Sequence, residues 1–165
     1  MKLSRIKGES VVGEKDTVEP PGSAHASDPM LMGVAGRCAI TREGRLLLLQ
    51  RPHGDGFDPG AWELPGGKAG SGETLIEAVA REVVEETALV VSVGRPYAVW
   101  HFVKLPYWVT GVGFLCNGWK GNVTLSEEHE RFVWATMEEA SSLPLARGTA
   151  EQLDALAALG PAAWA

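Results

Sequence analysis

Three glutamates, Glu82, Glu85 and Glu86, stand at spacing i, i+3, i+4 in a segment that contains no glycine or proline. In a helix of about 3.6 residues per turn, this spacing puts the three carboxylates within about 100° of one another. Carboxylates this close repel each other, and Arg81 offsets only part of the repulsion. A cation among them would relieve it, and ligation by oxygen alone selects a hard ion such as Mg²⁺, with Mn²⁺ as a substitute.

A helix over residues 73–87 must position these side chains. Ile76, Val79 and Val83 cluster to one side of the acidic arc, which predicts a helix that packs one face on a core and presents a compact acidic face. The alternative, for an isolated triplet of glutamates, is a solvated helix face that binds nothing.

A glycine-rich loop comes shortly before this helix. The segment 61–64 is expected to be a short strand that stops at Pro65-Gly66-Gly67. Glycines let backbone carbonyls and amides approach a ligand closely. From Gly67, five residues lead to Glu73, and seven more lead to the run from Arg81 to Glu86.

This arrangement resembles the Nudix box, a Gly, Glu, Arg-Glu and Glu-Glu pattern that here covers residues 67–89. The resemblance extends over roughly residues 31–145. It implies a Mg²⁺-dependent pyrophosphohydrolase that cleaves a diphosphate linkage in a nucleotide or nucleoside-diphosphate derivative, such as a nucleoside triphosphate or ADP-ribose. One position departs from the pattern, because Ala88 stands where the box has glycine. Either Ala88 adopts the left-handed conformation, at a cost of roughly 1 kcal/mol, or the helix ends in another way.

The resemblance also implies roles for individual residues. It gives the metal four oxygen ligands, which are Glu82, Glu85, Glu86 and the carbonyl of Gly66. Gly66 and Gly67 would also contact the substrate. Arg51, at the end of an earlier strand, is a candidate for binding a phosphate, with a plain surface arginine as the alternative. Glu73 and Arg81 would orient the loop and the acidic face.

The resemblance also implies a further catalytic glutamate in a late loop before a strand that contains tryptophan. Glu128, six positions before Trp134, is the first choice for a metal ligand or general base. Glu127 and Glu130 are the alternatives, and a charged surface loop without a catalytic role is the third interpretation.

The substrate stays open at this point. In the family that the box resembles, a downstream proline accompanies ADP-ribose cleavage and a downstream tyrosine accompanies dinucleoside polyphosphates, but Pro106 and Tyr107 are adjacent here. For Trp100 and His101, on a later strand, the expectation is a place in the core or at the rim, and the alternative is that they flank the substrate or a base. Two other functions remain as alternatives, a non-catalytic Nudix-like module that senses a nucleotide and an interaction domain whose acidic helix is only solvated.

The order of elements predicts an α+β fold. Strands are expected over residues 30–41, 45–50 and 61–64, followed by the helix, strands over 89–93, 97–103, 107–116 and 132–134, and a helix over 149–159. This order lacks βαβ alternation, so it favours a mixed sheet. The resemblance implies a Nudix-type α/β/α sandwich with a catalytic helix and a C-terminal helix.

Length and composition limit the organisation and the partners. The 165 residues suit one domain over 30–165, after a polar arm over 1–29 that is expected to be flexible. The formal net charge of −6 argues against binding a nucleic acid polymer. The sequence contains no apolar run of membrane-spanning length and no secretory signal, so a cytoplasmic protein is expected. Cys38 and Cys116 are expected on buried strands, with one disulfide as the alternative, and the resemblance admits a homodimer.

Overall fold

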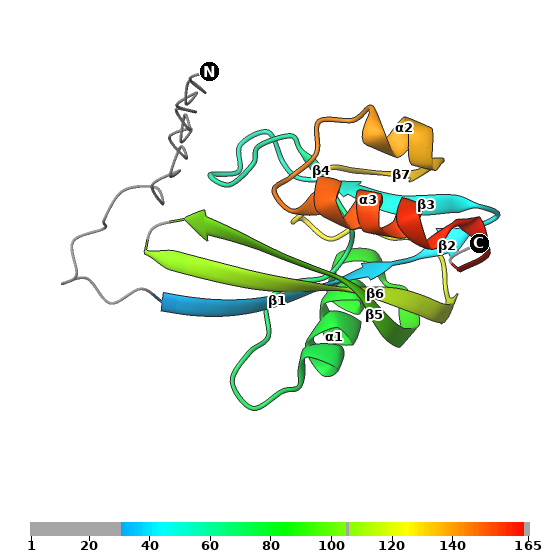
Figure 1. Cartoon of the computed structure of the whole chain (residues 1–165). Coiled ribbons are helices and arrows are strands. Elements are labelled where there is room, and N and C mark those ends of the chain that lie inside the picture. Colours follow the sequence, from blue (N-terminus) through cyan, green and yellow to red (C-terminus); the bar gives the residue numbers. More distant parts are fainter. Residues whose placement is uncertain (1–30, 105, 164–165) are drawn as a thin grey trace, which may run out of the picture.

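A computed structural model describes residues 31–104 and 106–163. The expected N-terminal arm over 1–29 lies outside these residues, and the single domain over 30–165 stays a prediction. The described chain forms two sheets (Figure 1). One has the order β1 (Leu31–Ala39), β6 (Tyr107–Lys120), β5 (Val90–Lys104). In the other, β3 (Arg45–Gln50) pairs with all three remaining strands, which are β2 (Thr41–Arg42), β4 (Trp62–Glu63) and β7 (Arg131–Ala135).

The first sheet is mixed, as the order of elements predicted. β1 runs parallel to β6, with Leu31 opposite Tyr107 and Ala39 opposite Leu115. β5 and β6 are antiparallel. The second sheet is antiparallel throughout. The predicted strand over residues 45–50 coincides with β3.

Helices cover the sheets on both sides and complete a three-layer sandwich (Figure 1). α1 (Leu75–Thr87) packs against β1 and β5, while α3 (Thr149–Leu159) packs against β5 and α2 (Met137–Ser141) packs against β3. The run of leucines in β3 is buried on both faces. Leu47 and Leu49 belong to the core beneath α1, and Leu46 and Leu48 belong to the core shared with α2 and α3. A strand that faces two helical layers needs apolar residues at successive positions, so this run is the sequence mark of the middle layer.

The helix α1 begins two residues later than the predicted range of 73–87. Thr74 is its N-cap, and Thr74 and Glu77 form a capping box in which each side chain accepts from the other's backbone N–H. At the other end, Ala88 takes the left-handed conformation, with φ 59° and ψ 11°. The core face is formed by Val79 and Val83. Ile76 was wrongly placed on that face, because it is 50% exposed in the structure.

Two further differences concern the second half of the chain. The predicted break between strands 89–93 and 97–103 is a set of β-bulges between Ser92 and Ala98, so β5 continues through it as one long strand. The short helix α2 was not predicted, although Thr136 caps it with the same box, in which Glu139 is the partner. A 3₁₀ turn, η1 (Pro161–Ala163), follows α3.

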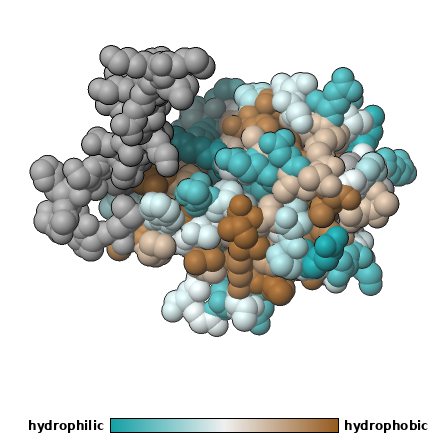
Figure 2. Space-filling view, in the orientation of Figure 1, coloured by the Kyte–Doolittle hydropathy of each residue, from teal (hydrophilic) through white to brown (hydrophobic). Residues whose placement is uncertain are grey.

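Apolar side chains reach the surface near α1 and the first sheet. Figure 2 shows hydrophobic patches on this side of the molecule, and among the exposed apolar residues Met32 is 72% and Val99 is 73% accessible. Within residues 31–104 and 106–163, no helix has both the length and the apolar character needed to span a membrane.

Candidate active site

The acidic face of α1 lies against the glycine-rich loop after β4. The carboxylate of Glu86 accepts the N–H of Gly66 at 2.8 Å. A Cβ atom on Gly67 would lie only 2.3–2.7 Å from the Glu82 carboxylate. Gly66 has φ 131°, and a Cβ there would lie 2.3 Å from the carbonyl oxygen of Gly36. Only glycines therefore let the loop approach both carboxylates this closely.

Arg81 organises the rest of the acidic face. Its guanidinium contacts Glu73 at 2.8 and 3.1 Å, Glu82 at 3.0 Å and Glu85 at 2.9 Å. Glu73 also accepts the N–H of Gly70, so it closes the loop that leads into the helix. Glu85 is exposed and pairs with Arg81, whereas Glu82 is half-buried beside the loop. Arg81 and Glu73 thus occupy the orienting positions that the family resemblance implied.

A buried glutamate on β4 forms the centre of a second network. Glu63 is 3% exposed, and its two oxygens accept from Arg37 at 2.6 Å and from Arg51 at 2.7 Å. Nε2 of His129 lies 3.2 Å from the same oxygen that Arg51 contacts. Burial alone would raise the pKa of Glu63, but the Arg37 charge, the His129 hydrogen bond and the Arg51 charge lower its pKa to about 2. Glu63 is therefore an anion that holds two arginines in place.

The Glu86 carboxylate lies next to this network in a different electrostatic position. Burial raises the pKa of Glu86 to about 8, against the opposing effects of the Arg37 charge and the Gly66 N–H. No cationic side chain donates a hydrogen bond to Glu86 among the described residues: Nη1 of Arg37 lies 4.0 Å from its carboxylate and donates to the carbonyl of Gly66, and Nε2 of His129 lies 3.9 Å away. A buried carboxylate that no cationic side chain hydrogen-bonds is suited to ligate a metal ion.

Glu63, Glu86 and His129 bring one ligand atom each within 4.8 Å of one another, a spacing that could hold a metal ion. Both oxygens of Glu63 already accept from arginines. Glu82, Glu86 and the Gly66 carbonyl offer oxygen alone, which suits a hard divalent ion better than a set that includes imidazole. The residues around the glycine loop therefore fit such an ion, and Glu63 and His129 fit the role of support behind it.

These groups line a cavity of about 690 Å³. Glu82, Glu86 and Glu128 supply carboxylates to its wall, and Arg37, Arg51 and Lys68 supply positive charge. The wall also holds the aromatic residues Phe57, Trp100, Phe102 and Tyr107, and two of them lie beside these cations, with the Arg51 guanidinium 5.6 Å from the Phe57 centroid and the Lys68 ammonium 5.7 Å from the Tyr107 centroid. The site thus combines oxygen ligands for a cation, cationic groups for an anion and an apolar surface for a flat group.

The structure brings some of the predicted late-loop and strand residues to the cavity and leaves others outside. Glu128 lines it, while Glu130 pairs with His53 at 2.9 Å and Glu127 is exposed. Arg51 lines the cavity but is also bound to Glu63 and Asp55. Trp100 is buried in the wall, whereas His101 is exposed and stacks on Trp108, with a distance of 5.5 Å between ring centroids.

Arg37, Glu63 and His129 were not predicted as site residues. For Glu63 there was a signal, because it is a charged residue in a short strand between Trp62 and Leu64, both of which are buried. Arg37 and His129 carry no comparable mark in the sequence. Their role depends on β1 and the loop before β7 meeting at β4, which only the folded chain shows.

Comparison with known proteins identifies the fold and the motif. The family model described as the NUDIX domain matches residues 31–158. A CTP pyrophosphohydrolase of Escherichia coli (strain K12) is 33% identical over 73% of this chain and 87% of its own length. A MutT-like protein of Streptomyces ambofaciens is 34% identical, with coverage of 82% and 84%.

Solved structures agree with these sequence matches. The solution structure of the E. coli ORF135 protein superposes with a TM-score of 0.69 and 30% identity, and covers 79% of this chain and 91% of that one. The crystal structure of the MutT protein from Methanosarcina mazei Go1 gives 0.70 and 30%, with coverage of 80% and 95%. The chain therefore belongs to the Nudix hydrolase family and is a pyrophosphohydrolase of that family, built on the α/β/α sandwich that the sequence predicted. Enzymes of this family generally use a divalent metal ion.

Proposed function

We propose that this chain hydrolyses nucleoside triphosphates with Mg²⁺ as its metal ion, which Glu82, Glu85, Glu86 and the Gly66 carbonyl would hold. One observation carries the proposal. The Glu82 and Glu86 carboxylates lie against the Gly66-Gly67 loop, in a cavity whose wall also holds the cationic side chains of Arg37, Arg51 and Lys68. The names of two relatives, a CTP pyrophosphohydrolase and a nucleoside triphosphatase that is 30% identical, favour a triphosphate over the ADP-ribose that the sequence left open.

The cationic side chains suit a polyphosphate. Arg37 and Arg51 are fixed by Glu63 and face the cavity beside Lys68. Their charges would bind the phosphate oxygens and offset part of the repulsion that protects an anhydride from a nucleophile. A divalent ion on the glutamates would supply the remaining charge neutralisation and acidify a bound water.

The reaction requires a proton acceptor next to the attacking water. The water oxygen forms a bond to phosphorus, the bond from phosphorus to the bridging oxygen breaks, and the bridging oxygen leaves with the electron pair as part of pyrophosphate. We assign the water proton to Glu128, because among the three glutamates of the late loop it lines the cavity, while Glu130 is paired with His53.

A comparison of two glutamates on the same helix tests the proposal. Glu86→Gln removes a proposed ligand, whereas Glu77→Gln changes an exposed residue whose capping role glutamine also fulfils. Nucleoside monophosphate and pyrophosphate are measured by chromatography across a panel of nucleoside triphosphates, ADP-ribose and dinucleoside polyphosphates, with Mg²⁺, with Mn²⁺ and with chelator. We expect the wild type to hydrolyse triphosphates and a chelator to abolish this turnover. Glu86→Gln should lower the turnover by at least about 100-fold, and Glu77→Gln should leave it unchanged.

The alternative is a nucleotide sensor without catalysis. Tight binding of a nucleoside triphosphate by the wild-type protein, without product in either metal, would exclude the hydrolase and favour the sensor. Rapid cleavage of ADP-ribose with no cleavage of triphosphates would support the hydrolase but contradict the proposal that its substrate is a nucleoside triphosphate.

A further inference from the structure

One face of the first sheet forms a wall of the cavity, and Trp100 lies on the strand of that wall farthest from Arg37. The three strands contribute alternate residues, which are Ala35 and Arg37 from β1, Tyr107 and Val109 from β6, and Trp100 and Phe102 from β5. Ala35 pairs with Gly111 and Gly111 pairs with Trp100, so these residues form one row across the sheet. Neighbouring strands lie about 4.8 Å apart, which separates β1 from β5 by about 10 Å. Phosphates bound beside Arg37 on β1 therefore leave the nucleoside part of a substrate within reach of β5.

Two glycines from different elements fix the indole ring of Trp100, which is 5% exposed. A Cβ atom on Gly111 of β6 would lie 2.2 Å from the ring, and one on Gly148, in the loop before α3, would lie 2.1 Å from it. Gly148 also has φ 79°, a backbone conformation that favours glycine. A side chain at either position would displace the indole, so the ring depends on both glycines for its place in the wall.

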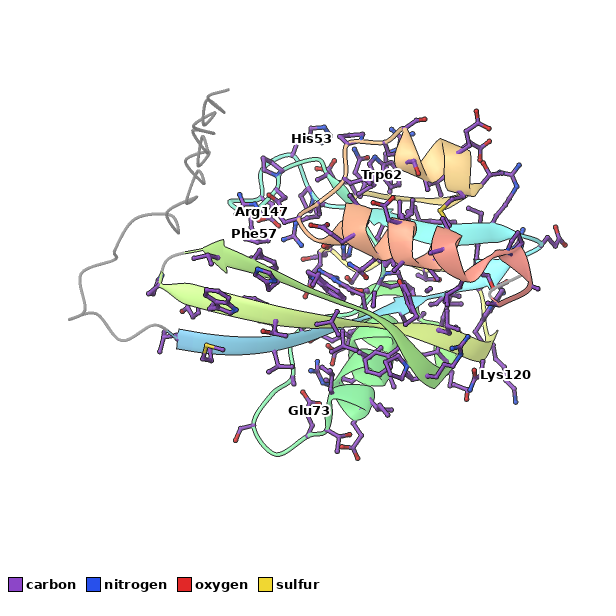
Figure 3. All side chains as sticks on the ribbon, viewed as in Figure 1. His53, Phe57, Trp62, Glu73, Lys120 and Arg147 are labelled. Carbon is purple, nitrogen blue, oxygen red and sulfur yellow. The ribbon has the colours of Figure 1, made fainter. Side chains whose placement is uncertain are left out.

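The loop that brings Gly148 to the ring is itself anchored. In Figure 3 the neighbouring Arg147 lies close to Phe57, and its guanidinium carbon is 5.0 Å from the centroid of that ring. One carboxylate oxygen of Asp58 accepts the backbone N–H of Arg147 at 3.0 Å, and the other lies 3.1 Å from its Nε. These contacts tie the loop before α3 to the loop after β3, and they hold the indole in one orientation before any ligand binds.

The indole N–H of Trp100 is a donor without an acceptor. In the part of the chain that the structure describes, nothing accepts it, whereas the indole N–H of Trp119 donates to the carbonyl of Thr41 at 3.0 Å. The Trp100 nitrogen is also not among the fully enclosed side-chain atoms that lack a partner. Because the residue is buried except where it lines the cavity, its N–H opens onto that cavity. A tryptophan N–H in such a place usually has a partner, and it can only donate.

We infer that Trp100, fixed by Gly111 and Gly148, binds the nucleoside part of the substrate by donating its indole N–H to an uncharged acceptor. This inference rests on the proposed function, since it adds a binding residue to the same site. The phosphates have their own partners on the other side of the wall, where Arg37 lies on β1 and the backbone of Lys68 bridges to Ala35. The acceptor is therefore a carbonyl oxygen or ring nitrogen of the base, or an oxygen of the sugar.

A pair of tryptophan variants tests the inference by kinetics. Trp100→Phe removes the N–H and keeps an aromatic ring. Trp119→Phe is the matched control, because it loses an indole N–H and its hydrogen bond at a residue that does not line the cavity. We would measure kcat and KM in Mg²⁺ for CTP, UTP, GTP and ATP, and the inhibition constant of ribose 5-triphosphate, which has the sugar but no base. Thermal unfolding shows whether each variant is folded.

Nuclear magnetic resonance of the wild type gives a second readout that does not depend on turnover. The assigned indole N–H signals are followed during titration with the α,β-methylene analogue of CTP, which cannot be cleaved between the first two phosphorus atoms. Cytidine is chosen because a relative is a CTP pyrophosphohydrolase. The Trp100 proton should move downfield, since a new hydrogen bond deshields it, and the Trp119 proton should stay in place.

For the best-cleaved nucleotide, Trp100→Phe should raise KM and lower kcat/KM by about 3- to 10-fold, with kcat little changed, because a neutral hydrogen bond made throughout the reaction is lost. Trp119→Phe should leave both constants unchanged. Ribose 5-triphosphate that binds Trp100→Phe equally more weakly places the acceptor on the sugar, and an effect confined to the nucleotides places it on the base.

Several results would overturn the inference while the hydrolase stands: an unchanged KM in Trp100→Phe, an equal rise of KM in both variants, or a Trp100 signal that stays in place at saturating analogue. Failure of the proposed function would instead appear as no cleavage of any nucleotide. The titration then decides alone, since a downfield shift of the Trp100 signal supports its binding role and an unmoved signal rejects it. The same titration decides if Trp100→Phe does not fold.

Discussion

Replacing Ala88 with glycine should stabilise the protein. Ala88 ends α1 in the left-handed conformation, at φ 59° and ψ 11°, and its N–H donates to the carbonyl of Val84 at 2.8 Å. In this conformation the Cβ atom approaches the following carbonyl, at a cost of about 1–2 kcal/mol. Glycine removes that cost but has more conformational freedom in the unfolded chain, which returns about 0.5–1 kcal/mol. The net expectation for Ala88→Gly is a gain of about 0.5–1 kcal/mol in the free energy of unfolding.

Urea unfolding followed by circular dichroism measures this difference, and in a chain of this size 1 kcal/mol corresponds to about 2–4 °C in Tm. Ala80→Gly is the matched control, because Ala80 lies inside the same helix with right-handed backbone, where the same substitution should cost about 1 kcal/mol. The two changes therefore have opposite expected signs. If Ala88→Gly also lowers the free energy of unfolding, the strain argument at the end of the helix is refuted.

Two other experiments test the buried charge network of Glu63 and the cysteine pair Cys38 and Cys116. Glu63→Gln leaves Arg37 and Arg51 without their buried anion, so the free energy of unfolding in urea should fall by about 3 kcal/mol, and a loss below about 1 kcal/mol would contradict the role given to Glu63. The Cys38 hydrogen bond lowers the pKa of Cys116 to about 7, while the same contact and burial raise the pKa of Cys38. Because the thiolate reacts, alkylation of Cys116 measured by mass spectrometry should rise as the pH increases through about 7, with Cys38 protected in the folded protein. Equal labelling of both cysteines at every pH would refute this assignment.

Local sequence patterns were sufficient to predict much of the fold. The apolar positions of α1, the leucines of β3 and the turn residues around Gly66 were sufficient to predict these elements, because each depends on neighbours along the chain. The start of α1 was missed by two residues because the capping box of Thr74 outweighs the helical pattern at Glu73, whose side chain binds Arg81 and the loop. The predicted burial of Ile76 was wrong, since the helix packs through a narrower face than the pattern indicated.

The rest of the site depends on contacts between distant segments, which the sequence did not predict. From the sequence, the glutamates of α1 and the loop of Gly66 and Gly67 were predicted to form one site, since the motif contains both segments. The network of Glu63, Arg37 and His129 comes from three separate segments. Its side chains become hydrogen-bond partners only when those segments pack together. A buried charge with partners this distant leaves no local periodicity, so sequence reasoning finds it only as an exception in an apolar strand.

The parallel pairing of β1 with β6 also bears on how the protein folds. Leu31 lies opposite Tyr107, so almost half of the chain, including the glycine loop and α1, is enclosed between the two strands. Closing so long a segment costs more entropy than joining neighbouring hairpins, and such pairings form slowly. Gly36 on β1 packs directly against Val79 of α1, where a Cβ atom would lie 2.2 Å from a methyl group. Because α1 packs against both β1 and β5, and β1 pairs with β6, we expect the nascent chain to acquire its carboxylate site only when synthesis has passed β6.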